Sequence, residues 1–197
     1  MRIVTIDFEA SCLPRHGRSF PIEVGIAHTD GRARSWLIQP VPEWSEWGWT
    51  EEAQSLHGIT RQQLDRDGLP IAQVLAELTE AVAGWRVFAD SHLDAGWLDT
   101  LANAARTPRP FRIEHIEALV DRFGATPEDI AAAQSCLAGE TFVRHRAGDD
   151  ARWLARFVIT LANVAGRRVH EVEAPQFGWA PPSGAEIRYG AGYAAAA

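Results

Sequence analysis

Apolar and polar positions follow a two-residue period at the start of the chain and a helical period further on. The first segment, residues 2–8, is apolar and β-branched, which predicts a buried strand. Residues 19–29 and residues 33–38 have the pattern of two further strands, joined by a turn at Asp30-Gly31. The pattern therefore predicts three antiparallel strands before any long helix.

The rest of the chain mostly shows apolar residues at helical spacing. The segment from Ile71 to Val82 is an example, because Val74, Leu75 and Leu78 fall on one helical face. The other predicted elements are a short helix near residues 50–55, a strand at residues 87–89, a helix that carries Asp94 and Leu101, a helical region over residues 108–140 in which Pro127 begins a helix, and a last helix over residues 148–165. Strands followed by helix, strand and helix predict an α/β sheet flanked by helices.

Length and composition narrow the class of protein. The 197 residues are enough to bury a substantial core, and we expect one domain over residues 1–170 with an irregular tail over residues 171–197. No apolar run reaches the ~20 residues needed to cross a bilayer, and the chain enters its first strand directly. The two cysteines do not suggest a disulfide framework, so the cytoplasm is the expected compartment, without membrane contact.

Two carboxylates stand at the end of the first predicted strand. Side chains two residues apart in a strand leave the same face, so Asp7 and Glu9 project together. Neighbouring carboxylates repel each other unless a cation lies between them, and hard oxygen ligands suit Mg²⁺ or Mn²⁺. An isolated Asp-x-Glu is more often a solvated strand end, so this pair alone does not establish a metal site.

A second chemical signal precedes the last predicted helix. Asp150 would stand at the N-terminus of that helix, with His145 in the loop before it. A neutral imidazole can act as a general base because its pKa lies near neutrality. The simpler alternative is a helix-capping aspartate, Asp149 or Asp150, beside a surface histidine.

Taken together, these segments resemble the DEDDh branch of the ribonuclease-H-like 3′–5′ exonucleases. The resemblance covers residues 3–164, and five short segments occur in the family's order. They are Asp7-Phe8-Glu9-Ala10-Ser11, Pro21-Ile22-Glu23-Val24-Gly25, Leu56-His57-Gly58-Ile59-Thr60, Asp94-Ala95-Gly96-Trp97-Leu98 and His145-Arg146-Ala147-Gly148-Asp149-Asp150-Ala151. The resemblance implies a mixed central sheet, with three antiparallel strands plus parallel strands, flanked by helices.

The resemblance also implies a reaction. Four acidic residues would hold two Mg²⁺ or Mn²⁺ ions, and His145 would accept a proton from the attacking water. Nucleoside 5′-monophosphates would then leave the 3′ end of single-stranded nucleic acid, with a lean towards RNA over DNA from the segments around Cys12 and His57. The four ligands implied are Asp7, Glu9, Asp94 and Asp150.

One motif departs from the family's pattern. Many relatives have His-Asn before the second aspartate, where this chain has Ala89 and Asp90. Asp90 is therefore a spare carboxylate and an alternative ligand, although the Trp-Leu pair after Asp94 favours Asp94. Asp149 competes with Asp150 in the same way, and the spacing from the histidine favours Asp150.

Substrate contacts are expected around the first motif and the connecting loop. The alternation of the strand points Phe8 into the core, so that only its backbone would face a nucleotide. Trp47, in a loop with Trp44 and Trp49, could stack on a base or could staple the loop as a small core. The expected contacts are Phe8, Ala10, Ser11, Cys12, Trp47, His57 and Ile59. For Cys12, as for Cys136, the simpler alternative is a small buried filler.

The charge balance is unusual for a protein that binds nucleic acid. The formal net charge is −7, and all 19 basic residues are arginines. Carboxylates neutralised by bound cations would account for part of this balance. Several arginines could contact phosphate, although each is more simply a solvated surface residue: Arg15, Arg18, Arg144, Arg146, Arg152 and Arg156. No long basic run favours tight binding to a duplex.

Three other functions use the same residues. A hydrolase of free nucleotides or dinucleotides would lose activity as the oligomer grows. A binding module without catalysis would hold an oligomer without cation-dependent cleavage. A proofreading subunit would act only with a polymerase. Relatives often dimerise, so a homodimer is possible, but no apolar stripe identifies an interface.

Overall fold

The computed structural model describes residues 1–167, and its centre is a five-stranded sheet with the order β3-β2-β1-β4-β5. Strand β1 pairs antiparallel with β2, and β2 with β3, whereas β1 pairs parallel with β4, and β4 with β5. The expected mixed sheet is confirmed. The strands are β1 (Ile3–Ala10), β2 (Pro21–His28), β3 (Ala33–Leu37), β4 (Arg86–Ala89) and β5 (Ile113–His115).

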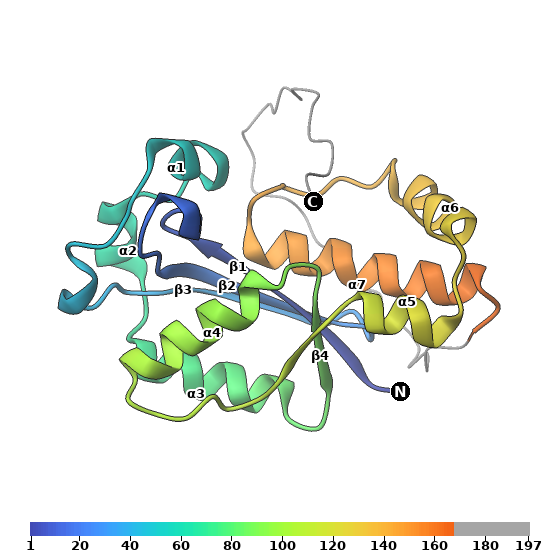
Figure 1. The fold of residues 1–197 in the computed structure, drawn as a ribbon, viewed down its shortest axis with the longest axis horizontal. Coiled ribbons are helices and arrows are strands. Elements are labelled where there is room, and N and C mark those ends of the chain that lie inside the picture. The colour runs from blue at the N-terminus through green and yellow to red at the C-terminus, as the bar shows by residue number, and fades with distance from the viewer. Residues whose placement is uncertain (168–197) are drawn as a thin grey trace.

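Helices cover both faces of this sheet (Figure 1), with α7 above the strands and α3 and α4 below them. On the α3 and α4 side, the β1 residues Ile6 and Phe8 belong to the larger core. On the other side, Ile3 and Phe88 pack with α5, α6 and α7. The helices are α1 (Glu51–His57), α2 (Arg61–Asp67), α3 (Ile71–Val82), α4 (Leu93–Ala104), α5 (Glu117–Phe123), α6 (Pro127–Leu137) and α7 (Ala147–Val164).

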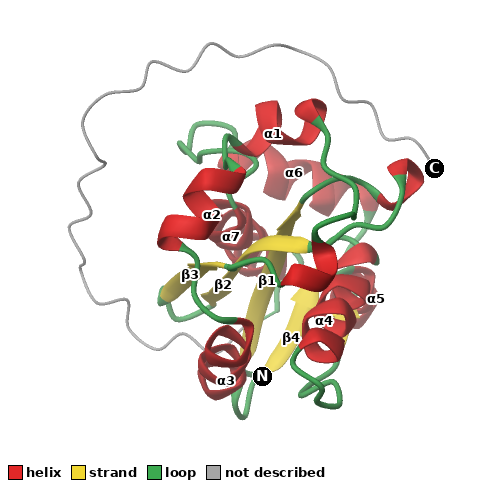
Figure 2. Ribbon diagram, turned by 90° about the vertical axis from the view of Figure 1, so that its left-hand side faces the viewer, coloured by secondary structure: helices red, strands yellow, loops and turns green. Residues whose placement is uncertain are grey.

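The first turn of α7 lies unusually close to the antiparallel strands. A Cβ atom at Gly25 would stand 2.2 Å from the carbonyl carbon of Ala147, so only glycine fits there. The hydroxyl of Thr5 on β1 donates a hydrogen bond of 2.6 Å to the carbonyl oxygen of Ala151. These contacts bring the start of α7 directly over β1 and β2, the strands that precede it by more than a hundred residues (Figure 2).

Most predicted elements are confirmed, with differences at their ends. Strand β1 continues to Ala10, so Glu9 lies within it rather than beyond it. The last helix spans Ala147–Val164, and Arg146 occupies its N-cap position without a capping side-chain hydrogen bond, so the prediction that Asp149 or Asp150 caps it is wrong. The start of α6 at Pro127 is confirmed.

Two elements were not predicted. The region expected to be helical over residues 108–140 contains β5, a three-residue half-buried strand that is too short to show a two-residue period. Helix α2 has one buried side chain, Leu64, and therefore no apolar stripe. The irregular tail predicted for residues 171–197 lies outside the described residues.

Two expectations from composition can be compared with the structure. Over residues 1–167, no helix is both long enough and apolar enough to cross a membrane. Both cysteines are free, and Cys12 is buried as expected. Cys136 is exposed, so the prediction that it fills the core is wrong.

We predict that Gly25→Ala lowers the free energy of unfolding by about 1–3 kcal/mol or more, because the added methyl group would overlap the backbone of α7. Urea unfolding followed by circular dichroism measures the change. Gly139→Ala is the control, since a Cβ atom there meets no atom within 4 Å. Equal losses in the two variants would contradict a close approach at Gly25.

Candidate active site

The carboxylates identified in the sequence gather where β1 approaches the first turns of α4 and α7. Asp7 and Glu9 share one face of β1, while Phe8, between them, is 5% exposed and packs in the core on the other face. Asp94 lies in the first turn of α4, and Asp150 lies in the first turn of α7. Three distant segments therefore bring four acidic side chains to one place.

The first cluster consists of Asp7, Asp90 and Asp94, which each place one oxygen atom within 4.8 Å of the others. Asp94 is 1% exposed, and its Oδ1 accepts a hydrogen bond of 3.1 Å from the backbone N–H of Phe8. Its Oδ2 has no hydrogen-bond partner among residues 1–167. This orphaned buried oxygen is therefore free to bind a cation.

The second cluster consists of Glu9, His145 and Asp150, again with ligand atoms within 4.8 Å of one another. Oδ2 of Asp150 accepts a hydrogen bond of 2.7 Å from the backbone N–H of His145. Within the described chain Oδ1 accepts no hydrogen bond, although Nε of Arg144 lies 3.3 Å away. His145 has a φ of 59°, a left-handed conformation that costs energy in a residue other than glycine.

Burial and mutual repulsion make these carboxylates hard to ionise. Burial, and then Asp150, raises the pKa of Glu9 to about 8. Burial, and then Asp90, raises the pKa of Asp94 to about 7. The pKa of Asp7 is raised well above its usual value, first by burial and then by Asp94 and Glu9. Bound cations would remove this penalty, and the all-carboxylate oxygen donors fit hard divalent ions such as Mg²⁺ or Mn²⁺.

The two aspartates of each alternative pair, Asp149 or Asp150 and Asp90 or Asp94, have different surroundings. Asp149 pairs with Arg152 at 2.8 Å and belongs to neither carboxylate cluster, whereas Asp150 faces Glu9. Asp90 and Asp94 both lie beside Asp7, but Asp90 is exposed and Asp94 is buried. The geometry thus favours Asp150 and Asp94, and it leaves Asp90 at the rim of the first cluster.

Glu23 is the residue that the sequence reasoning missed. It lies opposite Glu9 on β2, is 2% exposed, and binds Arg146 through two hydrogen bonds of 3.1 and 2.8 Å. It also accepts a hydrogen bond of 3.0 Å from the backbone N–H of Ala147. Glu23 therefore anchors the start of α7, and with it Asp150. The available signal was a charged residue in the middle of an apolar strand.

Most arginines considered for phosphate contact are already paired. Arg146 binds Glu23, Arg152 binds Asp149, and Arg156 binds Glu140. Arg144 approaches Asp150, and Arg15 approaches Glu52 at 3.9 Å. No carboxylate among residues 1–167 pairs with Arg18, whose guanidinium group lies over the ring of Trp47.

The connecting loop brings His57 towards the second cluster. Burial, and then the charges of Arg146 and His145, lowers the pKa of His57 to about 4, so its ring is neutral at pH 7. Its Nδ1 accepts a hydrogen bond of 2.9 Å from the backbone N–H of Ile59, which places the proton on Nε2. This Nε2–H has no partner within the described chain and is a free donor.

Like His57, which is 5% exposed, most of the other expected substrate contacts are buried. Ser11 and Cys12 are buried, and Ser11 Oγ accepts a hydrogen bond of 3.1 Å from the backbone N–H of Phe20. Trp44 is 3% exposed and stacks on Phe20 with ring centroids 5.1 Å apart, and both residues belong to the larger core. Trp47 is half-buried and packs against this core. Ala10 and Ile59 are also buried.

Comparison with known proteins identifies similar chains. Residues 4–158 match the RNase_T family of exonucleases. Comparison with curated protein sequences gave no match. A solved full-length 3′-exonuclease has a TM-score of 0.63 and 21% identity, covering 85% of this chain and 84% of that chain.

Two exonuclease I structures are also similar. Exonuclease I from Methylocaldum szegediense has a TM-score of 0.58 and 16% identity, covering 82% of this chain and 42% of that chain. E. coli Exonuclease I in complex with a dT13 oligonucleotide has a TM-score of 0.56 and 12% identity, covering 82% of this chain and 42% of that chain. This chain therefore spans less than half the length of those proteins, and the likeness establishes a shared fold.

We predict that the protein without cations loses stability as the pH rises from about 4.5 to about 8, because folded Glu9 keeps a proton that the unfolded chain has lost. Glu9→Gln removes this penalty. At pH 8 in EDTA, the variant should be more stable by on the order of 1 kcal/mol, or about 2–4 °C in melting temperature.

Differential scanning calorimetry with EDTA and with Mg²⁺ measures both effects. The Mg²⁺-dependent rise in melting temperature should be large in the unmodified protein and small in Glu9→Gln. Glu46→Gln is the control, since Glu46 is exposed and outside both clusters. Identical melting of all three proteins in EDTA at pH 8 would contradict the repulsion at this site.

Proposed function

The chain belongs to the RNase_T exonuclease family, and on that premise we propose that it is a metal-dependent 3′–5′ exonuclease. It removes nucleoside 5′-monophosphates one at a time from single-stranded nucleic acid. The observation that carries this proposal is the pair of ligand clusters on one strand face, one of which includes a histidine. A solvated strand end has no reason to gather one buried and three half-buried carboxylates.

Asp7, Glu9, Asp94 and Asp150 hold two divalent cations, Mg²⁺ or Mn²⁺. The orphaned oxygens of Asp94 and Asp150 and the raised pKa of each of the four carboxyl groups support this assignment. When bound, the cations supply Lewis-acid polarisation of the phosphodiester and stabilise the charge on the leaving 3′ oxygen.

His145 is the general base in this scheme. Its imidazole accepts a proton from the attacking water, and proximity to Glu9 and Asp150 supports that role. The hydrogen bond from its backbone N–H to Asp150 ties the loop to the carboxylate cluster. Asp150 therefore has two tasks, as a ligand and as a positioning residue for His145.

The substrate is a single strand with a free 3′ end. The likeness to an exonuclease I that was solved with dT13 supports this choice, although that likeness establishes only the fold. The neutral His57 donates its Nε2–H to the terminal nucleotide, and the backbone between Phe8 and Ala10 faces the same nucleotide. RNA is the favoured substrate on the sequence resemblance alone. None of the contacts named here distinguishes a 2′-hydroxyl, so they do not bear on the choice between RNA and DNA.

We predict that 5′-labelled single-stranded RNA and DNA oligomers shorten from their 3′ ends with Mg²⁺ or Mn²⁺, and stay intact in EDTA. Denaturing gels of a time course show the ladder, and chromatography identifies the mononucleotide released. The faster of the two matched oligomers defines the substrate class. If dinucleotides are cleaved and longer oligomers are not, the protein is a nucleotide phosphodiesterase instead.

We predict that Asp150→Ala lowers kcat by at least about 10³-fold while the protein remains folded, because it removes a cation ligand and the partner of His145. Asp149→Ala is the matched control: the two residues are adjacent on α7, but Asp149 faces Arg152. Initial rates on the preferred oligomer measure both. Equal losses in the two variants would contradict the assignment of Asp150.

A further inference from the structure

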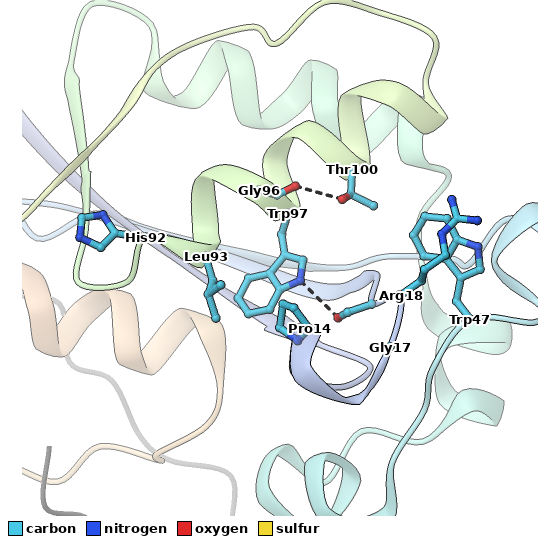
Figure 3. Close-up of a pocket in the computed structure, with 10 residues that line it drawn as sticks. Pro14, Gly17, Arg18, Trp47, His92, Leu93, Gly96, Trp97 and Thr100 are labelled. Atoms are coloured by element: carbon cyan, nitrogen blue, oxygen red, sulfur yellow. Dashed lines mark hydrogen bonds between the residues drawn. The ribbon is translucent and has the colours of Figure 1, made fainter. Parts of the chain in front are cut away.

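A cavity of about 380 Å³ opens between the β1–β2 connection and α4 (Figure 3). It begins at His92 and Leu93, directly before the carboxylate of Asp94 in the chain, and continues along α4 to Thr100. Seven residues of helix correspond to about 10 Å, so the cavity leads away from the carboxylates by more than the length of one base. No step of the proposed hydrolysis uses it.

The walls of this cavity are aromatic and already ordered. Trp97 is 8% exposed, and its Nε1–H donates a hydrogen bond of 3.3 Å to Ser19 Oγ. Figure 3 shows the Trp97 indole above Pro14, with Trp47 and Arg18 at the other end of the cavity. Trp47 rests on Trp44, with ring centroids 5.9 Å apart. Because Arg18 lies over the Trp47 ring and Trp44 packs against it, a planar ligand would meet the Trp97 wall and the rim of Trp47, which are in place without being ordered first.

Arg18 adds a charge that fits phosphate. Its guanidinium carbon lies 4.1 Å from the centre of the Trp47 ring, which fixes the plane of the group. The side chain is exposed, and no carboxylate among residues 1–167 pairs with it. A planar guanidinium with unused N–H donors binds phosphate oxygens in two-point contacts.

We propose that this cavity binds the nucleotides on the 5′ side of the one being removed, with a base against the Trp97 and Trp47 walls and a phosphate at Arg18. The inference rests on the proposed function and names where the rest of the strand lies. Stacking does not discriminate among the bases, and no group lining the cavity recognises a 2′-hydroxyl. The cavity therefore sets a preference for strand length, and it does not choose between RNA and DNA.

Gly96→Leu tests the proposal by filling the cavity. Gly96 lines it, and a Cβ atom there meets no atom within 4 Å, so the side chain enters open space. Leucine also favours the helix more than glycine does, so α4 should be retained. Arg18→Ala removes the phosphate contact. Arg2→Ala is the matched control, since Arg2 likewise lies over a tryptophan, Trp85, outside the cavity.

Binding is measured by fluorescence anisotropy with 5′-fluorescein dT8 and rU8 in EDTA at low ionic strength, so that no hydrolysis is required. We expect Gly96→Leu and Arg18→Ala each to raise Kd about tenfold, as loss of one stacked base or one phosphate contact does. Arg2→Ala should bind as the unmodified protein does. Thermal melting checks that each variant is folded.

Two results would overturn the proposal: no binding of either oligomer by the unmodified protein, or unchanged Kd in folded Gly96→Leu and Arg18→Ala. Failure of the exonuclease activity is a separate outcome. If the unmodified protein binds dT8 through this cavity in EDTA but cleaves nothing with Mg²⁺ or Mn²⁺, the cavity is a nucleic-acid site and the proposed hydrolysis is wrong.

Discussion

The desolvation of carboxylates gathered at one end of β1 is the constraint on which the rest of this structure depends. Asp7, Glu9, Asp94 and Asp150 come from three segments, and burial raises the pKa of each. Neighbouring carboxylates raise the pKa further for Asp7, Glu9 and Asp94. By contrast, Arg144 and the backbone N–H of His145 favour the charged form of Asp150. Such a cluster is costly in a protein without cations, since buried charges need partners. The fold holds the carboxylate cluster in place by hydrogen bonds and packing that leave most of its negative charge uncompensated.

Those contacts share one purpose, which is to fix the start of a helix against a strand. The backbone N–H of Phe8 holds Asp94. The buried Glu23 pairs with the half-exposed Arg146 at the start of α7, and Gly25 allows the first turn of that helix to approach β2. These pairings, rather than the formal net charge of −7, determine which charges surround the carboxylate clusters. The acidic total conceals arginines that are paired near the site and one, Arg18, that no carboxylate among residues 1–167 pairs with.

Sequence patterns predicted the parts of this arrangement that depend on local periodicity. The two-residue period of β1 places Asp7 and Glu9 together and turns Phe8 into the core, as the structure has it. Helix α3 was predicted with its observed ends because its apolar stripe is complete. Strand β5 was not predicted, because its three half-buried residues are too few to show a two-residue period. Its position depends on its pairing with β4.

The spacing from His145 already favoured Asp150 over Asp149, and the tertiary structure adds the surroundings that distinguish the two acids. Asp149 and Asp150 are adjacent in the chain, and only the packing of α7 on β2 shows which one faces Glu9. The role of Glu23 likewise depends on a partner 123 residues away. The tryptophan loop was equally ambiguous: Trp44 belongs to the larger core, whereas Trp47 is half-buried beneath Arg18.

Anomalous diffraction from crystals soaked in Mn²⁺ tests the central claim most directly, because it locates cations without requiring activity. The account predicts two anomalous peaks, one bound by Asp7 and Asp94 and the other by Glu9 and Asp150. No peak at either cluster, with the four carboxylates arranged as described here, would contradict it.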